Sequence, residues 1–245
     1  MRCFFLLSIF ILFSCSSSNK KLTAQQIIDK TILASGADLV ENSVISFDFR
    51  DKNYKATRNN GKFSLTRTRV IDSVSIKDVI SNNGFQRFIN NKNIEVLDSM
   101  AVKYANSVNS VHYFSVLPFG LNDRAVNKKL LPEVSINGKE YYKIEISFSQ
   151  DGGGEDFEDV FIYWIDKNSF LIDYLAYKFH VNGGGVRFRE LKEQCFKNGI
   201  RFVDYNNYKP DNKEIKITDL DIEYEKNQLN KVSEIILANI EVELL

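Results

Sequence analysis

The chain has 245 residues, of which 44% are hydrophobic and 26% are charged, and its 32 basic residues equal its 32 acidic residues. This balance argues against a nucleic-acid partner and against electrostatic attachment to a membrane, because neither a basic field nor a polybasic block is present. Aromatic residues make up 13% of the chain and there are only three prolines, a composition that favours extended, paired strands.

The first residues have the pattern of a lipoprotein leader. Met1-Arg2 is a short positive region, and the apolar run from Cys3 to Phe13 is too short to span a bilayer. Leu12-Phe13-Ser14-Cys15 resembles the lipobox of bacterial lipoproteins, which implies cleavage of residues 1–14 and attachment of lipid to the sulfur of Cys15. The alternative is an ordinary secretory signal peptide. The lipoprotein reading makes the membrane a partner, reached through the lipidated N-terminus.

Two main helices and one short helix are expected in the mature chain. Residues 15–22 form a polar tether, and Thr23 and Gln26 then fit a capping box at the start of a helix that ends at Gly36. A second helix is predicted from Asp98 to Phe114 by apolar residues at helical spacing. A short third helix is expected near Asp123 to Leu131.

The rest of the chain has the alternation of strands. Asparagine–glycine pairs such as Asn137-Gly138 and Asn198-Gly199 mark hairpin turns, and four or five antiparallel strands follow one another from Tyr142 to Asn206. The strands Phe157 to Asp166 and Leu171 to Val181 are apolar on both faces, so we expect both faces to be covered. Two further strands are predicted after Pro210, at Ile215 to Tyr224 and at Val232 to Leu244.

These elements predict a mainly β (α+β) fold for residues 23–245. We expect one domain, built as a single curved antiparallel sheet or half-barrel of ten or eleven strands with helices packed against one face. The glycine triplets Gly152–Gly154 and Gly183–Gly185 fall at alternate connections of the meander and are therefore expected at the same sheet edge.

Polar residues gather around these triplets and form a candidate rim site. Its members are Asp151, Asp156, Asp159, His180, Arg187, Arg189 and Asp204. The arginines could clamp a carboxylate or phosphate, or they could form cross-strand ion pairs. The acidic residues could bind Ca²⁺ or form a solvated loop, and no metal-binding spacing is present, so we expect no metal and no cofactor.

Several segments resemble an uncharacterised lipoprotein family of Bacteroidota. They include Ser107 to Phe114, Leu117 to Asp123, Gly183 to Arg189 and Gly199 to Tyr205. The family implies no established activity. Its architecture is similar to the half-barrels of lipoprotein carriers of the LolA and LolB type, in which a curved sheet encloses helices and an apolar ligand.

Two functions compete on this basis. In the binding hypothesis, the curved sheet and the helix from Asp98 to Phe114 enclose an apolar pocket for a hydrophobic or amphiphilic ligand such as a lipid, and the rim arginines hold its polar head. The pocket would be lined by Tyr113, Phe114, Trp164 and Tyr174. In the alternative, the rim is a hydrolytic or acid–base site that uses His180, Asp159, Asp204 and an arginine. We expect a periplasm-facing protein of the outer membrane, with the inner membrane as the other possibility.

The leader generates the first testable prediction. Replacement of Cys15→Ala should abolish lipid attachment, because only a thiol at this position can be acylated. Intact-mass spectrometry of the membrane fraction checks this, with Cys3→Ala as the matched control that retains the lipid. A wild-type protein cut elsewhere and carrying no acyl chain would contradict it.

Overall fold

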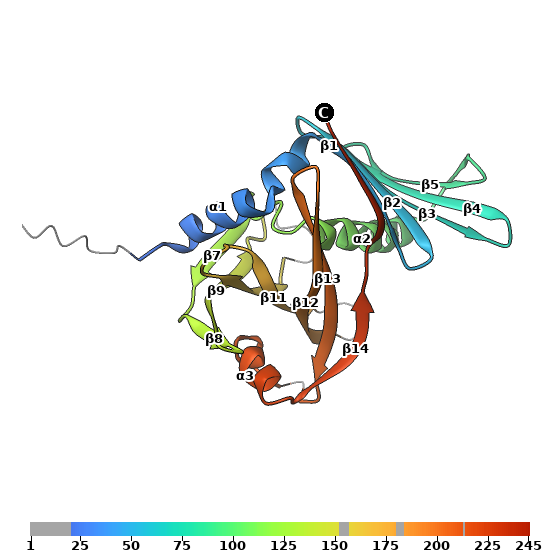
Figure 1. The fold of residues 1–245 in the computed structure, drawn as a ribbon. Coiled ribbons are helices and arrows are strands. Elements are labelled where there is room, and N and C mark those ends of the chain that lie inside the picture. The colour runs from blue at the N-terminus through green and yellow to red at the C-terminus, as the bar shows by residue number, and fades with distance from the viewer. Residues whose placement is uncertain (1–20, 152–156, 180–183, 213) are drawn as a thin grey trace, which may run out of the picture.

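The computed structural model describes residues 21–151, 157–179, 184–212 and 214–245. In these residues the chain forms two antiparallel sheets and three α-helices (Figure 1). The prediction of a mainly β fold with few helices is confirmed. The number of sheets and strands differs from the expectation, since the described residues hold one sheet of seven strands and one of eight.

The first sheet is a meander to which the C-terminal strand is added beside β1. Its strands are β1 (Ser43–Phe49), β2 (Lys52–Asn59), β3 (Lys62–Ile71), β4 (Val74–Ser81), β5 (Gly84–Ile89), β6 (Lys92–Ile94) and β15 (Ala238–Leu244). The hairpin predicted at Asn59-Asn60-Gly61 is present. Both Asn60 and Gly61 have positive φ, of 48° and 77°, which asparagine and glycine tolerate better than other residues.

The second sheet holds the meander that the sequence predicted between Tyr142 and Asn206. Its strands are β7 (Val126–Leu130), β8 (Val134–Ile136), β9 (Lys139–Phe148), β10 (Val160–Asp166), β11 (Ile172–Phe179), β12 (Gly185–Lys197), β13 (Ile200–Pro210) and β14 (Leu229–Ile235). Val160 pairs with Lys178 and Phe179 with Gly185, so these strand ends are neighbours at one edge. The triplet Gly152–Gly154 and Gly183 lie outside the described residues.

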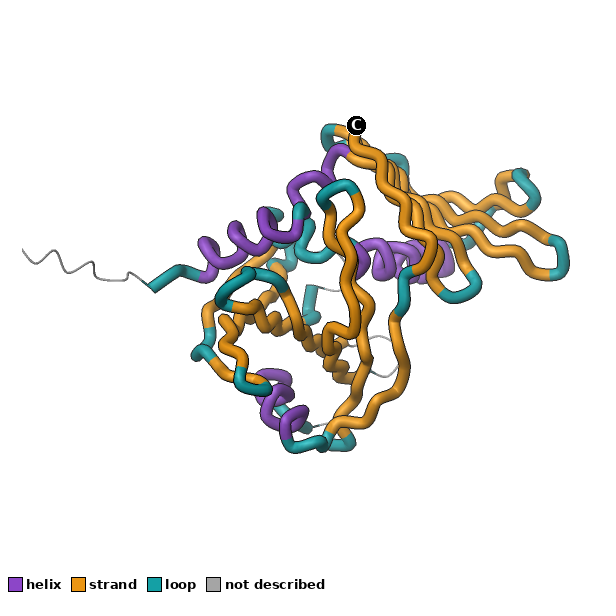
Figure 2. Tube along the Cα trace, in the orientation of Figure 1, coloured by secondary structure: helices purple, strands orange, loops and turns teal. Residues whose placement is uncertain are grey.

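Three α-helices pack against the sheets (Figure 2). They are α1 (Ala24–Ser35), α2 (Asp98–Ser115) and α3 (Leu220–Glu225), with short 3₁₀ helices η1 (Ala37–Asn42) and η3 (Ile217–Asp219). The predicted capping box of α1 is present, since Thr23 and Gln26 exchange hydrogen bonds. Helix α2 contacts β3, β4 and β5 of the first sheet, and its C-terminal end reaches the second.

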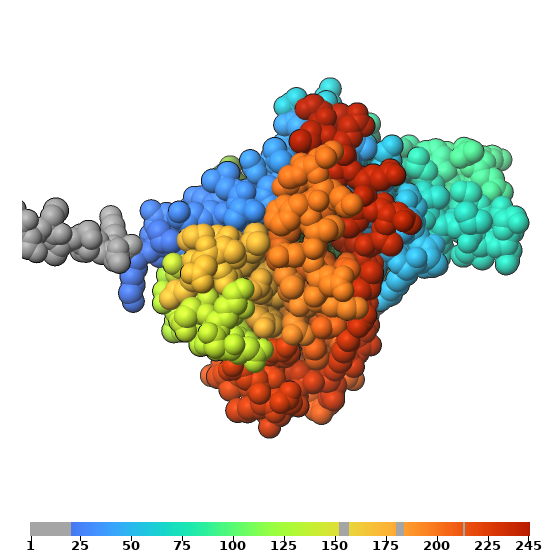
Figure 3. All heavy atoms as spheres, viewed as in Figure 1, coloured from blue at the N-terminus to red at the C-terminus, as the bar shows by residue number. Residues whose placement is uncertain are grey.

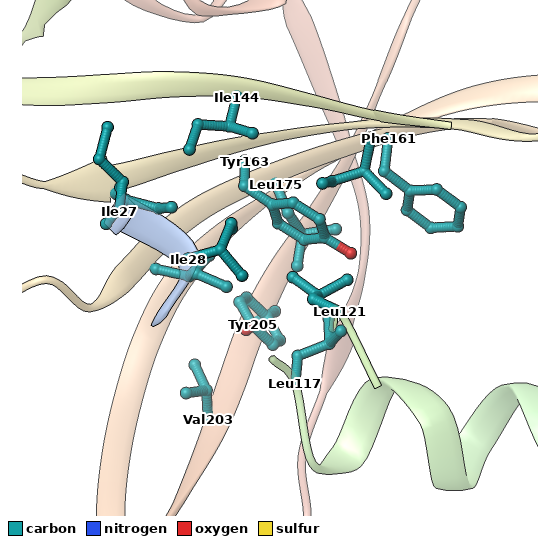
Figure 4. Close-up of a cluster of buried hydrophobic side chains, with 13 residues drawn as sticks. Ile27, Ile28, Leu117, Leu121, Ile144, Phe161, Tyr163, Leu175, Val203 and Tyr205 are labelled. Carbon is teal, nitrogen blue, oxygen red and sulfur yellow. The ribbon is translucent and has the colours of Figure 1, made fainter. Parts of the chain in front are cut away.

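The second sheet is covered on both faces, as its doubly apolar strands predicted. One face packs against α1, the end of α2 and the loop that follows α2, and Figure 4 shows Tyr163 and Leu175 meeting Ile27, Ile28 and Leu121 there. The opposite face packs against η3 and α3, where Trp164, Phe188 and Leu220 are fully buried. Successive residues of β10 therefore enter two different cores.

The two sheets meet along the β12–β13 hairpin and the C-terminal strands. Ile200 and Phe202 pack against Ile45 and Phe47 of the first sheet. The chain passes from β14 in the second sheet to β15 in the first, and the space-filling view shows its C-terminal residues lying over this junction (Figure 3). Contact is close at Gly36, where a Cβ would lie 1.9 Å from the carbonyl oxygen of Gly199, so only glycine fits there.

The single strand predicted from Val232 to Leu244 is divided between β14 and β15, which lie in different sheets. Two further sequence predictions assign the wrong type of element. The segment Asp123 to Leu131 forms a turn and β7 in place of a helix, because its backbone pairs with the edge of β9. The segment Ile215 to Tyr224 forms η3 and α3 in place of a strand. Leu220 of this segment packs on the apolar face of the second sheet. A strand added to the sheet would lie at its edge and would leave this face uncovered.

A buried ion pair fastens α3 to the sheet and generates the second prediction. The ammonium of Lys143 donates to both carboxylate oxygens of Asp221 at 3.0 and 2.8 Å, and the indole of Trp164 donates to Oδ2 at 3.2 Å. Replacement of Asp221→Leu leaves the ammonium buried without its partner and should lower the free energy of unfolding by about 3–5 kcal/mol.

Urea denaturation followed by circular dichroism measures this loss. The double replacement Lys143→Met with Asp221→Leu is the matched control, because it removes both charges and should recover most of the stability. An equal loss in the single and the double variant would show that packing around α3, and not the unpaired charge, is responsible.

Candidate ligand-binding site

A cavity of about 570 Å³ lies between the C-terminal half of α2 and the second sheet. Its volume is in the range of pockets that hold small organic ligands. The lining comes mainly from α2 and from strands β9 to β14, with Phe49 from the end of β1 and Leu237 from the segment between β14 and β15. The lining residues are Phe49, Asn106, Asn109, Ser110, Val111, Tyr113, Phe114, Ser115, Phe148, Asp159, Phe161, Tyr177, Phe179, Arg187, Arg189, Val203, Tyr205, Ile235 and Leu237.

Aromatic rings form most of the wall. The ring centroid of Phe114 lies 5.1 Å from that of Tyr177, and the Phe161 centroid lies 5.8 Å from Tyr177 and 6.1 Å from Tyr113. These distances are those of favourable ring pairs, which hold the wall in place. Figure 4 shows Phe161 at the end of the buried cluster that continues through Tyr163. The cavity is thus an extension of the core of the second sheet.

Burial opposes ionisation of the phenols of Tyr113 and Tyr205 in this wall and of Tyr163 behind it, since it raises the pKa of each. Burial raises the pKa of Tyr113 to about 12, against a smaller opposing effect of its hydrogen bond with Tyr163. Burial also raises the pKa of Tyr163 and of Tyr205. The only hydroxyl contact between the first two rings is long, with 3.5 Å between their oxygens. The wall therefore offers apolar surface and neutral hydroxyls.

Arg189 is the one strongly polar group deep in this wall, among the lining residues that the structure describes. Its guanidinium lies 4.1 Å from the ring centroid of Phe114 and 5.0 Å from that of Tyr177. Nη2 donates to the Tyr177 hydroxyl at 3.0 Å, whereas Nε is buried without a hydrogen-bond partner. The residue is only 7% exposed. A buried donor without a partner is unfavourable, and a ligand oxygen would relieve this cost.

Alternation along β12 places Arg187 on the same face as Arg189. Arg187 pairs with Tyr177 across the strands, and Arg189 pairs with Leu175. The guanidinium of Arg187 lies 5.3 Å from the Phe179 ring centroid and Nη1 donates to the Val186 carbonyl at 2.9 Å. It is partly exposed, so the cavity has one arginine inside and one nearer to solvent.

The structure brings five of the predicted residues together. Tyr113, Phe114, Asp159, Arg187 and Arg189 all line the cavity, and they come from α2, from the segment before β10 and from β12. The sequence analysis had assigned them to two separate groups, a pocket and a rim. They form one site because the end of α2 lies over the edge at which β10 begins.

Trp164 and Tyr174 require a correction, since they do not share this cavity. They belong to the core on the opposite face of the sheet, where Trp164 contacts Asp221 and the Tyr174 ring stacks on Phe188 at 5.6 Å. Successive side chains of β10 point to opposite faces of the sheet, so Trp164 points away from the face that carries Phe161 and Tyr163 and therefore away from α2. Large aromatic residues alone did not reveal which face was involved.

Asp204 also lies apart from the predicted rim. It lies in the interior of β13, where it pairs with Glu193 of β12. Its carboxylate accepts a hydrogen bond from the backbone N–H of Leu237 at 2.9 Å. Burial raises the pKa of this carboxyl group. The lining residues of β13 are its neighbours Val203 and Tyr205, which point to the other face. The acid–base constellation proposed from sequence is therefore not assembled around Asp204.

The remaining predicted site residues are Asp151, Asp156, His180 and Cys15. Asp151 is exposed at a turn and is not among the lining residues. Asp156, His180 and Cys15 lie outside the described residues. Across the described part of the chain, no three histidine, cysteine, aspartate or glutamate side chains are grouped closely enough to hold a metal ion.

Sequence reasoning missed the polar side of α2. Asn106, Asn109 and Ser110 line the cavity, while the apolar stripe of the same helix includes the buried Val108. Their i, i+3, i+4 spacing places them on one helical face. A polar face beside an apolar stripe normally indicates solvent, so this signal alone would not have indicated a cavity.

The fold and cavity define a class: a mainly β protein with two open antiparallel sheets and a ligand-sized hollow between sheet and helix. The chain belongs to a family of unknown function, DUF6503, whose pattern matches residues 1–236. A search of curated proteins finds no match. Within the described residues, none of the helices combines the length and the apolar character needed to cross a membrane.

Solved structures of similar fold include three bacterial proteins. A LolA superfamily protein from Nitrosomonas europaea is 13% identical, with 92% of this chain and 96% of that chain covered and a TM-score of 0.48. A DUF1329 family protein from Desulfovibrio piger is 10% identical, with 89% and 92% covered and a TM-score of 0.44. A putative outer membrane lipoprotein-sorting protein domain from Vibrio parahaemolyticus is 8% identical, with 75% and 86% covered and a TM-score of 0.40.

His112, beside the cavity on α2, has a structural environment that generates the third prediction. Its Nε2 lies 2.9 Å from the Thr66 carbonyl oxygen, and its ring packs against Phe47 and Tyr54. Burial lowers the pKa of His112 to about 4, and the hydrogen bond to Thr66 opposes this effect. The folded protein thus keeps His112 neutral at pH values where the unfolded chain, with a pKa near 6.5, is protonated.

The stability that the neutral ring contributes should be complete above pH 6.5 and should disappear as the pH falls to 4, a loss of about 3 kcal/mol. Urea denaturation of the wild type and of His112→Gln at pH 7 and pH 4.5 tests this. The glutamine variant retains a donor for Thr66 but does not titrate, so its stability should fall less on acidification. An identical fall in both proteins would contradict the prediction.

Proposed function

We propose that this protein binds a single amphiphilic molecule, with the apolar part in the 570 Å³ cavity and an anionic head group at Arg189. The observation that carries the proposal is the buried guanidinium whose Nε has no hydrogen-bond partner within an aromatic wall. A closed core would not require a charge at this position, whereas a carboxylate-bearing ligand would supply both the missing acceptor and the opposite charge.

The lining supports a ligand with an apolar tail. Rings such as Phe114, Phe148 and Phe161 present carbon surface, and burial of such surface contributes roughly 25 cal/mol per Å² of ligand area removed from water. The neutral phenols and the amides of Asn106 and Asn109 add hydrogen-bonding positions without adding charge. The electrostatic contribution to binding would then come mainly from Arg189, with Arg187 nearer to solvent.

The proposed setting is a membrane surface. Lipidation of Cys15 would anchor the chain. An anchor with more than one acyl chain holds a protein stably at a bilayer. Residues 15–22 would tether the cavity close to a source of amphiphiles, on the periplasmic side and at the outer membrane. The alternative rim enzyme has less support, since Asp204 lies on the other face of β13 from the cavity.

A fluorescent fatty acid titration tests the binding proposal. We expect the wild type to bind cis-parinaric acid at one site. The variant Arg189→Met should bind about tenfold to a hundredfold more weakly, because a charge-assisted hydrogen bond contributes roughly 1.5–3 kcal/mol. Ser110→Trp should also abolish binding, because this exposed helix residue lines the cavity and an indole would fill it.

Lys103→Trp is the matched control, since Lys103 is exposed on the same helix and lines neither this cavity nor its neighbour. It should bind as the wild type does. Mass spectrometry of lipids that copurify from membranes would identify the natural ligand. The proposed role of Arg189 would be refuted if the wild type did not bind cis-parinaric acid or if Arg189→Met bound it as tightly as the wild type does. It would also be refuted if the wild type bound the neutral analogue parinaryl alcohol equally tightly.

A further inference from the structure

A second cavity of about 420 Å³ lies on the other side of Tyr113, between the β2–β3 hairpin of the first sheet and the loop that follows α2. Asn109, Tyr113 and Phe148 line both cavities and separate them. The other residues that line the second cavity are Glu41, Arg58, Gly61, Lys62, Phe63, Leu65, Val116, Phe119, Gly120, Asp123, Ala125 and Val126.

Arg58 gives this second cavity its chemistry. The residue lies on β2 and is only 7% exposed, and its Nη1 is buried without a hydrogen-bond partner. The guanidinium lies 5.2 Å from the ring centroid of Phe119. Glu41, which lines the same cavity, accepts the backbone N–H of Gly61 at 2.7 Å instead of bonding to this nitrogen. An acceptor for Nη1 is therefore missing inside a cavity that has room for one.

The charge on Arg58 is retained although its surroundings oppose it. Burial lowers the pKa of Arg58 to about 10, and the negative charge of Glu41 has the opposite, smaller effect. The guanidinium is thus protonated at neutral pH. A buried charge with incomplete compensation is costly, and an anion bound beside it would remove most of that cost.

We propose that this second cavity is a binding site for a small monocarboxylate, whose carboxylate accepts a hydrogen bond from Nη1 of Arg58 and whose apolar part packs against Phe119, Leu65 and Val126. Guanidinium and carboxylate match in geometry and charge. The site goes beyond the amphiphile site at Arg189, because it has its own arginine and its own lining on the opposite side of Tyr113.

The acidic residues of the lining favour a single negative charge. Glu41 and Asp123 both line the cavity, against Arg58 and the exposed Lys62. Burial raises the pKa of Asp123, and the charge of Glu41 raises it further, so negative charge is already crowded on this side. A doubly charged phosphate would add twice as much negative charge beside these acidic groups as one carboxylate, so the lining disfavours phosphate more strongly.

Isothermal titration calorimetry with 3-phenylpropionate on the full chain tests the site, with 3-phenylpropanamide as the neutral analogue and inorganic phosphate as the alternative anion. Because Arg189 in the first cavity can also bind a carboxylate, that cavity is first filled with saturating cis-parinaric acid. We then expect one further site in the wild type, with the amide and phosphate each bound at least about tenfold more weakly. Arg58→Met should lose at least about tenfold in affinity, and Lys103→Trp, which lines neither cavity, should stay within about twofold of the wild type.

Arg58→Lys guards against a folding defect in the methionine variant, because it retains a positive charge but lacks the planar fork. It should bind at least about fivefold more weakly than the wild type. The proposal is overturned if the wild type does not bind 3-phenylpropionate, if the amide or phosphate binds as well, or if both Arg58 variants bind normally. Failure of the amphiphile proposal would appear separately, as loss of cis-parinaric acid binding with the Arg58 site intact.

Discussion

The structure depends on the burial of the second sheet on both faces. Strands β10 and β11 are apolar on both sides, so each face needs its own cover, and the chain supplies α1 with the end of α2 on one face and α3 on the other. The cavity exists where the first cover is incomplete. There the rings of Phe114 and Phe161 continue the core. Most of α2 lies against the first sheet, so only its C-terminal end covers the second sheet and a hollow remains.

The buried charges of the described residues differ in how they are compensated. Asp78 receives hydrogen bonds from Arg67 and Arg87, and Lys143 is paired with Asp221, so these charges are compensated within the fold. Arg58 and Arg189 are equally buried, yet each has a nitrogen without a hydrogen-bond partner. Each of them also lines a cavity. Arg201 and Asp166 also have a buried atom without a hydrogen-bond partner but line neither cavity, so such an atom does not by itself mark a ligand site. Arg58 and Arg189 combine an unpartnered nitrogen with a cavity that has room for an acceptor.

Local patterns predicted the elements whose causes are local. The capping box at Thr23 and the asparagine–glycine turns appear where expected, since their hydrogen bonds and positive φ values involve neighbouring residues only. The segment Ile215 to Tyr224 was misassigned because alternation over a few apolar residues suits both a strand and a short covering helix. Its conformation is decided by the exposed apolar face of the sheet, on which Leu220 packs.

The sequence by itself determined which residues share a face. Alternation placed Arg187 with Arg189 and separated Trp164 from Phe161, and this follows from the period of two in a strand. Only the tertiary structure decided what each face meets. The addition of β15 to β1, the position of α2 over the β10 edge and the second cavity at Arg58 all come from contacts between residues far apart in the chain. Periodicity carries no information about such contacts, because it describes the orientation of side chains within an element and not the partner that covers them.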